Sequence, residues 1–180
     1  MQFIRSTFLI FLLTLSNLAF SATKAELDAE INVALDELYK FSPAAQELSK
    51  KAKGILVFPG IIKAGLVFGG AYGEGALIIG GKKVQYYNNV GGSVGFQIGV
   101  QKRAEVYLFM TDDALKTFRN KSGWEAGGDA SVAVAVWGVG GEINTETIED
   151  PVVAFVYSNK GLMYNLNLEG AKISKIDTPQ

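Results

Sequence analysis

Two glycine-rich runs between Lys53 and Val100 constrain the fold of this chain more than any other feature. In the second run, Asn89–Val100, larger residues such as Val94, Phe96 and Ile98 alternate with mostly small ones, and a period of two predicts a β-strand. Glycine weakens a strand unless another element approaches closely or the sheet bends sharply. We therefore predict a curved antiparallel sheet whose glycine-rich face lets another element pack against the backbone.

The distribution of glycine also divides the chain into two portions. All 21 glycines lie at or after Gly54, so residues 22–53 are predicted to be helical and residues 54–176 to form a β-rich body. In Thr23–Lys40 apolar residues recur at helical spacing, and a second helix follows, with Ser42 as its N-cap and Pro43 at its first position.

The first helix has an acidic polar face, unlike the lysine-rich face of a helix that lies on a membrane surface. One interpretation is a helix docked on the sheet of its own domain. The alternative is a detachable helix that contacts lipid or a partner.

The body contains one more helix, which begins after Thr111 with Asp112 and Asp113 at its positive end. Strands are predicted at 55–58 (ended by Pro59-Gly60), 63–68, 71–79, 84–87, 104–110, 130–139, 152–157, 162–168 and 172–176, with a turn at Gly80-Gly81 and an edge position for the last strand. The predicted fold is one α+β domain, residues 22–180, with a curved antiparallel sheet that is closed or half-closed into a barrel. Two N-terminal helices and the third helix pack on this sheet.

Residues 1–21 have the features of a secretory signal peptide. Arg5 supplies the positive charge, Phe8–Leu15 the apolar core, and Ala19-Phe20-Ser21 a cleavage site of small residues. The prediction is export, with the mature protein periplasmic or peripheral on the cell envelope. An uncleaved membrane anchor is the alternative, although the apolar run is shorter than the roughly 20 residues of a spanning helix.

Composition excludes several classes of function. The chain has no histidine and no cysteine, which removes histidine-based catalysis, cysteine nucleophiles, most zinc sites and disulfides. Without Arg5 the mature chain has 16 basic and 18 acidic residues, a net charge of −2, which gives no field for nucleic acid. The acidic groups Asp112/Asp113 and Glu146/Glu149/Asp150 match no calcium-loop spacing. We predict no enzyme, no catalytic residue, no metal and no cofactor.

Separated motifs carry a family resemblance, at residues 52–75, 91–101, 129–135, and 156–162 together with 168–170. In this order, they resemble the SYLF domain family, and the resemblance spans roughly Ala25 to Ile176. It implies interaction with lipid, because SYLF domains of eukaryotes bind phosphoinositide-rich membranes and some bundle actin. The family's membrane-binding N-terminal helix corresponds loosely to Thr23–Lys40.

The candidate contacts for such a surface are clustered basic residues and one tryptophan. The clusters are either solvated turns and helix ends or a headgroup site, and they comprise Lys50, Lys51, Lys53, Lys82, Lys83, Lys102 and Arg103. Trp124 follows a helix stop and is expected to be partly exposed, as a membrane or partner contact. The function predicted is a non-enzymatic protein that binds anionic phospholipid or a membrane surface. The alternative is a structural or protein-interaction module with an envelope protein as partner.

The signal-peptide prediction is tested by the mass of the exported protein. Expression of the full chain in a Gram-negative host is expected to give a periplasmic protein whose intact mass starts at Ala22, because cleavage follows Ser21. A membrane-bound product that retains residues 1–21 would instead establish an uncleaved anchor.

Overall fold

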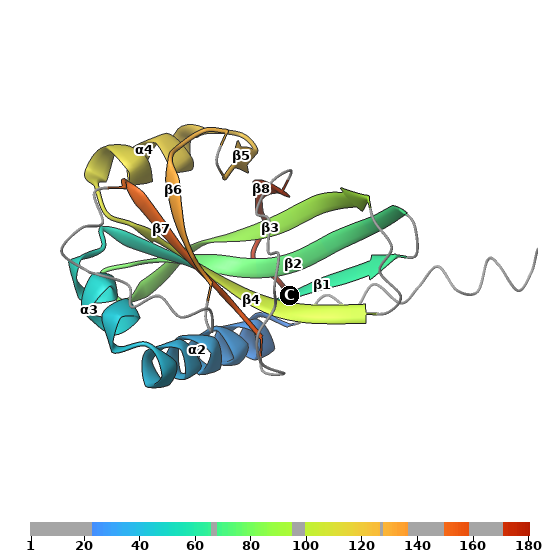
Figure 1. Cartoon of the computed structure of the whole chain (residues 1–180), viewed down its shortest axis with the longest axis horizontal. Helices are drawn as coiled ribbons and strands as arrows, with labels where there is room; N and C mark the ends of the chain where they lie inside the picture. The colour runs from blue at the N-terminus through green and yellow to red at the C-terminus, as the bar shows by residue number, and fades with distance from the viewer. Residues whose placement is uncertain (1–22, 66–67, 95–99, 127, 137–149, 159–170) are drawn as a thin grey trace, which may run out of the picture.

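The computed structural model describes residues 23–65, 68–94, 100–126, 128–136, 150–158 and 171–180. Within them it contains three helices and eight strands (Figure 1), which confirms the predicted α+β domain with a curled, half-closed sheet. The helices are α2 (Lys24–Phe41), α3 (Pro43–Lys51) and α4 (Asp112–Asn120). The strands are β1 (Gly54–Gly65), β2 (Phe68–Ile79), β3 (Lys82–Val94), β4 (Val100–Phe109), β5 (Trp124–Glu125), β6 (Val132–Val136), β7 (Val152–Tyr157) and β8 (Ala171–Ile176).

The strands form one sheet in the order β5-β8-β3-β2-β1-β4-β7-β6. Every pair in it is antiparallel except β6 and β7, which run parallel, so the prediction of a wholly antiparallel sheet is wrong at this edge. Strand β8 was expected at an edge, but it lies between β3 and the two-residue strand β5. Helices α2 and α3 cover one face and α4 the other, so each face has its own apolar core.

Strand β1 carries the irregularity that shapes the sheet. It was predicted to end at Pro59-Gly60, but it continues through them to Gly65, with register shifts against β4 and β2 at this point. Proline cannot donate a ladder hydrogen bond, so a central strand tolerates it only at such a bulge.

Glycines of β2 lie directly against this bulged segment. A Cβ at Gly75 would lie 2.1 Å from the carbonyl oxygen of Val57, and one at Gly73 would lie 2.7 Å from Cγ1 of Ile61. The prediction that glycines permit close approach is confirmed at these two positions. The approach lets β1 and β2 pair within a strongly curved sheet.

The β2–β3 hairpin turns at the predicted place. Gly80 and Gly81 have φ values of 57° and 77°, the left-handed conformations that a two-residue hairpin turn of type I′ requires. Strand β3 then continues without a break to Val94, longer than the segment predicted at 84–87.

Helix α2 is docked on the sheet, as in the first of the two interpretations. Its N-terminus has a capping box between Thr23 and Glu26, and its apolar stripe, Leu27, Ile31, Ala34 and Leu38, is buried against the sheet. The Ser42 side chain caps α3 by accepting from the Ala45 amide.

Several predictions concern segments outside the described residues. They are the signal peptide, Phe96 and Ile98 of the glycine-rich strand, the acidic group at 146–149 and the strand at 162–168. In the part of the chain that is described, no helix combines the length and apolar character needed to cross a membrane. The same residues contain no group of three or more acidic, histidine or cysteine side chains that could hold a metal ion.

The close approach of β1 and β2 predicts a position-specific effect of alanine. Gly75→Ala is expected to lower the free energy of unfolding by about 3 kcal/mol, because the methyl group would overlap backbone at Val57. Gly92→Ala is the control, since a Cβ there meets no atom within 4 Å, and it is expected to change stability by less than about 0.5 kcal/mol. Urea unfolding measures both, and equal losses would contradict the proposed packing role of Gly75.

Candidate functional site: the flanks of helix α2

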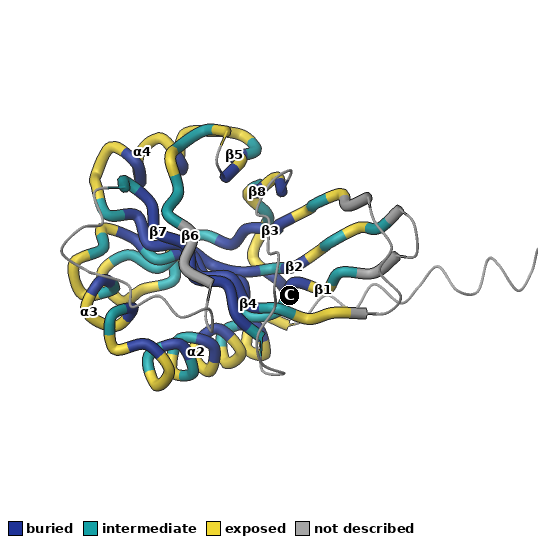
Figure 2. The backbone as a smooth tube through the Cα atoms, viewed as in Figure 1, coloured by how far each residue is buried: buried dark blue, intermediate teal, exposed yellow. Residues whose placement is uncertain are grey.

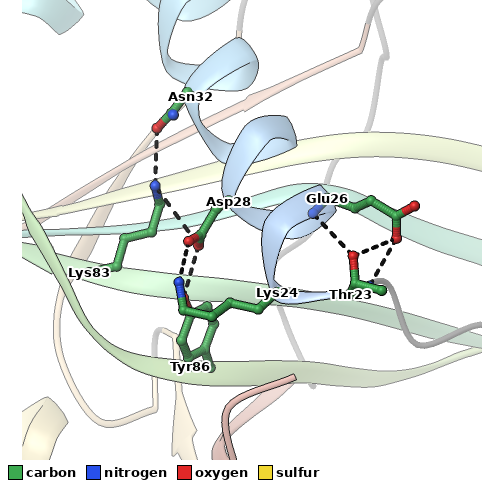
Figure 3. A network of polar contacts seen from close by, with 7 residues as sticks. All are labelled: Thr23, Lys24, Glu26, Asp28, Asn32, Lys83 and Tyr86. Carbon is green, nitrogen blue, oxygen red and sulfur yellow. Dashed lines mark hydrogen bonds and ion pairs between the residues drawn. The ribbon is translucent and has the colours of Figure 1, made fainter. Parts of the chain in front are cut away.

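The flank of α2 that faces β3 is held by a polar network around Asp28 (Figure 3). Lys24 Nζ donates to Asp28 Oδ2 at 2.6 Å, and the Tyr86 hydroxyl donates to Asp28 Oδ1 at 2.9 Å. Lys83 Nζ lies 3.8 Å from Asp28 Oδ1 and donates to Asn32 Oδ1 at 3.2 Å. Strand β3 therefore contributes two side chains that fix the N-terminal half of the helix.

The same contacts determine the protonation of the network. Partial burial alone would raise the pKa of Asp28, but the hydrogen bonds from Lys24 and Tyr86 and the charge of Lys83 outweigh it, so the pKa is lowered. The hydrogen bond to Asp28 raises the pKa of Lys24. The pKa of Tyr86 is raised mainly by burial and, to a smaller extent, by its hydrogen bond to Asp28. At neutral pH Asp28 is therefore an anion and Lys24 a cation.

The opposite flank of α2 borders a pocket of about 320 Å³ between the helix and strands β1, β4 and β7. Lys102 Nζ of β4 lies 3.7 Å from Glu30 Oε2 at one wall. The Tyr157 hydroxyl at the end of β7 donates to the carbonyl oxygen of Ala34. The remaining lining includes the half-buried carboxyl group of Glu37 and an apolar part formed by Ala29, Val33, Pro59 and Ala104.

Arg103 also borders this pocket, but its guanidinium group is paired with Glu105. Its Nε donates to Oε1 of the fully buried Glu105 at 2.7 Å. Glu105 Oε2 accepts from the Tyr107 hydroxyl at 2.7 Å and from the Asn89 amide at 3.1 Å. The pKa of Tyr107 is raised well above its ordinary value, mainly by burial and also by the charge of Glu105. A buried carboxylate is costly unless it is paired with a cation and hydrogen-bonded, and the three donors to Glu105 meet this need. The network is therefore a structural element of the core.

The structure does not bring the seven predicted basic residues to one place. Lys50 Nζ lies 2.6 Å from Glu47 Oε1, and Lys53 Nζ lies 3.7 Å from Asp112 Oδ2. Lys51 and Lys82 are exposed and make no ion pair with a described residue. Lys102 and Arg103 line one pocket together, and acidic side chains pair with five of the seven basic residues.

The structure buries Trp124. Its side chain is 1% exposed, and its ring makes edge contacts with the rings of Tyr107, Phe109 and Phe118. The expectation of a partly exposed tryptophan is wrong because β5 pairs with β8 and turns the indole into the core under α4. This position therefore offers no surface to a membrane or a partner.

A feature missed in the sequence is a row of exposed apolar side chains across the sheet. Ile62, Tyr72 and Val90 are direct register partners on β1, β2 and β3, and they are 50%, 48% and 47% exposed. The row continues to Lys102 on β4 and to Lys172 on β8, the register partners of Ile62 and Val90. Direct partners project from the same face. Figure 2 shows exposed positions toward the far ends of these strands, beyond α2. We call the three apolar residues, together with the lysine at each end, the apolar row.

Sequence patterns contain only part of the signal for this row. Alternation along β3 assigns Tyr86 and Val90 to one face, but it does not reveal that Tyr86 is buried while Val90 is 47% exposed. The alignment of Ile62 with Tyr72 follows from the bulge in β1, at a position where the sequence predicts the end of a strand.

The family resemblance is confirmed by comparison with known proteins. Residues 90–178 match the family model Ysc84, described as the Las17-binding protein actin regulator, which corresponds to the SYLF domain. This description of the family concerns binding and regulation.

Two relatives come from the yeast Saccharomyces cerevisiae. LAS seventeen-binding protein 3 is 29% identical over 134 residues, which cover 71% of this chain and 29% of that protein. Protein YSC84 is 28% identical over 131 residues, covering 69% and 28% respectively. The match thus spans less than a third of the length of either yeast protein.

The network around Asp28 predicts a pH-dependent contribution to stability. Asp28→Asn is expected to lower the free energy of unfolding by about 1–3 kcal/mol at pH 7, because it weakens charge-assisted hydrogen bonds. Since the pKa of Asp28 is lowered in the folded protein, its contribution is present above the ordinary value near pH 4 and is lost as pH falls through the folded pKa. Urea unfolding of both proteins should therefore converge toward pH 2.

Asp36→Asn is the matched control for this prediction. Asp36 is exposed on the same helix and makes no hydrogen bond or ion pair with a described residue. An equal loss in this control, or a difference for Asp28→Asn that stays constant with pH, would refute the role of the network.

Proposed function

We propose that this protein is a non-enzymatic phospholipid-binding protein that is exported to the cell envelope of a bacterium. The observation that carries the proposal is the apolar row. Three large apolar side chains stand half-exposed in one line, and lysines flank them at both ends. An apolar centre with basic ends matches the boundary between acyl chains and headgroups of a bilayer.

The magnitudes favour weak, reversible attachment. Burying the exposed halves of Ile62, Tyr72 and Val90 would contribute roughly 3 kcal/mol, since a fully buried side chain contributes about 1.5–3 kcal/mol. Each lysine near an anionic surface adds about 1 kcal/mol, and the pairing of Lys102 with Glu30 reduces its share. These contributions suit a protein that binds the surface peripherally.

Two further observations support a binding protein over an enzyme. The chain lacks histidine and cysteine, the side chains most used for acid–base and nucleophilic chemistry near neutral pH. The matching family is described by binding and regulation, and one of the yeast relatives is named as a binding protein.

A protein partner is the second candidate, because the name of the yeast relative states that it binds LAS seventeen. An envelope protein could cover the same apolar row, since protein interfaces also bury apolar and aromatic side chains. In this case the row would be protected by a soluble partner and not by vesicles.

Vesicle binding by serine variants tests the proposal. Val90→Ser is expected to weaken binding to vesicles of phosphatidylethanolamine and phosphatidylglycerol several-fold, and Ile62→Ser with Val90→Ser by at least about tenfold, because apolar contact with the bilayer is lost. Val84→Ser is the control, since Val84 is 46% exposed on the same strand but lies about 20 Å from Val90 along it. Co-sedimentation measures each affinity.

Two results would contradict the proposal. The first is a wild-type protein that binds no vesicle at low salt. The second is equal binding by the wild type and the double serine variant, which would remove the apolar row from the contact. Protection of the row by a co-purified envelope protein, without vesicle binding, would support the second candidate.

A further inference from the structure

The pocket beside α2 carries charges of both signs at opposite ends. At one end Lys102 Nζ lies 3.7 Å from Glu30 Oε2. At the other end Glu37 is half-buried and makes no hydrogen bond or ion pair with a described residue. Glu37 lies seven positions after Glu30 on the helix, which places the two ends about 10 Å apart.

The charge balance of the pocket disfavours a ligand that is only an anion. Arg103 lines the pocket, but Glu105 already neutralises its guanidinium group. Lys102 is then the one cation that can face a ligand among the pocket residues, against the carboxylates of Glu30 and Glu37. A ligand that brings one negative and one positive group satisfies both ends.

The pair between Lys102 and Glu30 does not block such a ligand. Both side chains are about half-exposed and their atoms are 3.7 Å apart, so the pair contributes little to stability. A phosphate group would compete with Glu30 for Lys102 at small cost. Between the charged ends the lining is apolar, with Val33 and Pro59.

The apolar row begins at the same lysine. Ile62 is the register partner of Lys102, and Tyr72 and Val90 continue the row across the sheet. A lipid whose phosphate lies at Lys102 would thus have its acyl chains directed over an apolar surface.

We propose that this pocket binds the zwitterionic headgroup of an aminophospholipid, with the phosphate at Lys102 and the primary ammonium at Glu37. The assignment rests on the proposed phospholipid-binding function and specifies its ligand. A primary ammonium donates hydrogen bonds to a carboxylate, whereas the quaternary ammonium of choline has no N–H donor. The pocket therefore selects ethanolamine over choline headgroups.

Vesicles of matched charge test this selectivity. The wild type is expected to bind 3:1 phosphatidylethanolamine/phosphatidylglycerol vesicles about tenfold more tightly than 3:1 phosphatidylcholine/phosphatidylglycerol vesicles, as expected for one lost charge-assisted hydrogen bond. Glu37→Gln is expected to abolish the preference. Asp36→Asn, which removes a charge on the exposed side of α2, should retain it.

Two additional measurements keep the result interpretable. Lys102→Gln should weaken binding to both vesicle types, and it tests the phosphate end if Glu37→Gln does not fold. Soluble O-phosphoethanolamine should shift the NMR signals of pocket residues and compete with the vesicles. Shifted NMR signals with phosphoethanolamine, but no binding to any vesicle, would assign the pocket to a free metabolite and overturn the lipid assignment.

The outcomes separate this inference from the proposed function. Equal binding to both vesicle types, unchanged in Glu37→Gln, would overturn the headgroup site and leave phospholipid binding intact. No binding to any vesicle and no response to phosphoethanolamine would overturn both. A preference for ethanolamine that Glu37→Gln removes and Asp36→Asn retains would support both.

Discussion

The contact between the bulged part of β1 and the glycines of β2 is the constraint on which the rest of the structure depends. Gly73 and Gly75 have no side chain where Ile61 and the Val57 carbonyl lie, so the two strands pair while the sheet curls strongly. The bulge also absorbs Pro59 and shifts the register beyond it. That register brings Ile62 opposite Tyr72 and thereby creates the apolar row.

Helix α2 decides which parts of this sheet remain available. Its apolar stripe covers the middle of one face, and its acidic side chains pair with cations on both sides, Asp28 with Lys83 and Glu30 with Lys102. The acidic face, which is unusual for a helix on an anionic membrane, is thus used within the molecule. What remains is an apolar surface beyond the helix and a pocket of mixed charge along its flank.

The sequence predicted helices and turns accurately where neighbouring residues alone determine them. The cap at Ser42, the turn at Gly80-Gly81 and the stripe of α2 depend on neighbouring residues, and the structure confirms each. The predicted site was less accurate, because charge clusters in sequence do not reveal their partners. Lys83 is neutralised by Asp28 of helix α2, 55 positions earlier in the chain, and Trp124 is buried by a strand pairing that no local pattern indicates.

The sequence by itself determined the class of the domain, its resemblance to the SYLF family and the absence of histidine and cysteine chemistry. These properties depend on composition, on periodicity and on motifs in order. Only the tertiary structure decided the sheet order, the parallel β6–β7 pair, the apolar row and the mixed charge of the pocket. The physical reason is that register and ion pairing join residues from distant segments, and their energies depend on burial and distance, which exist only in the folded chain.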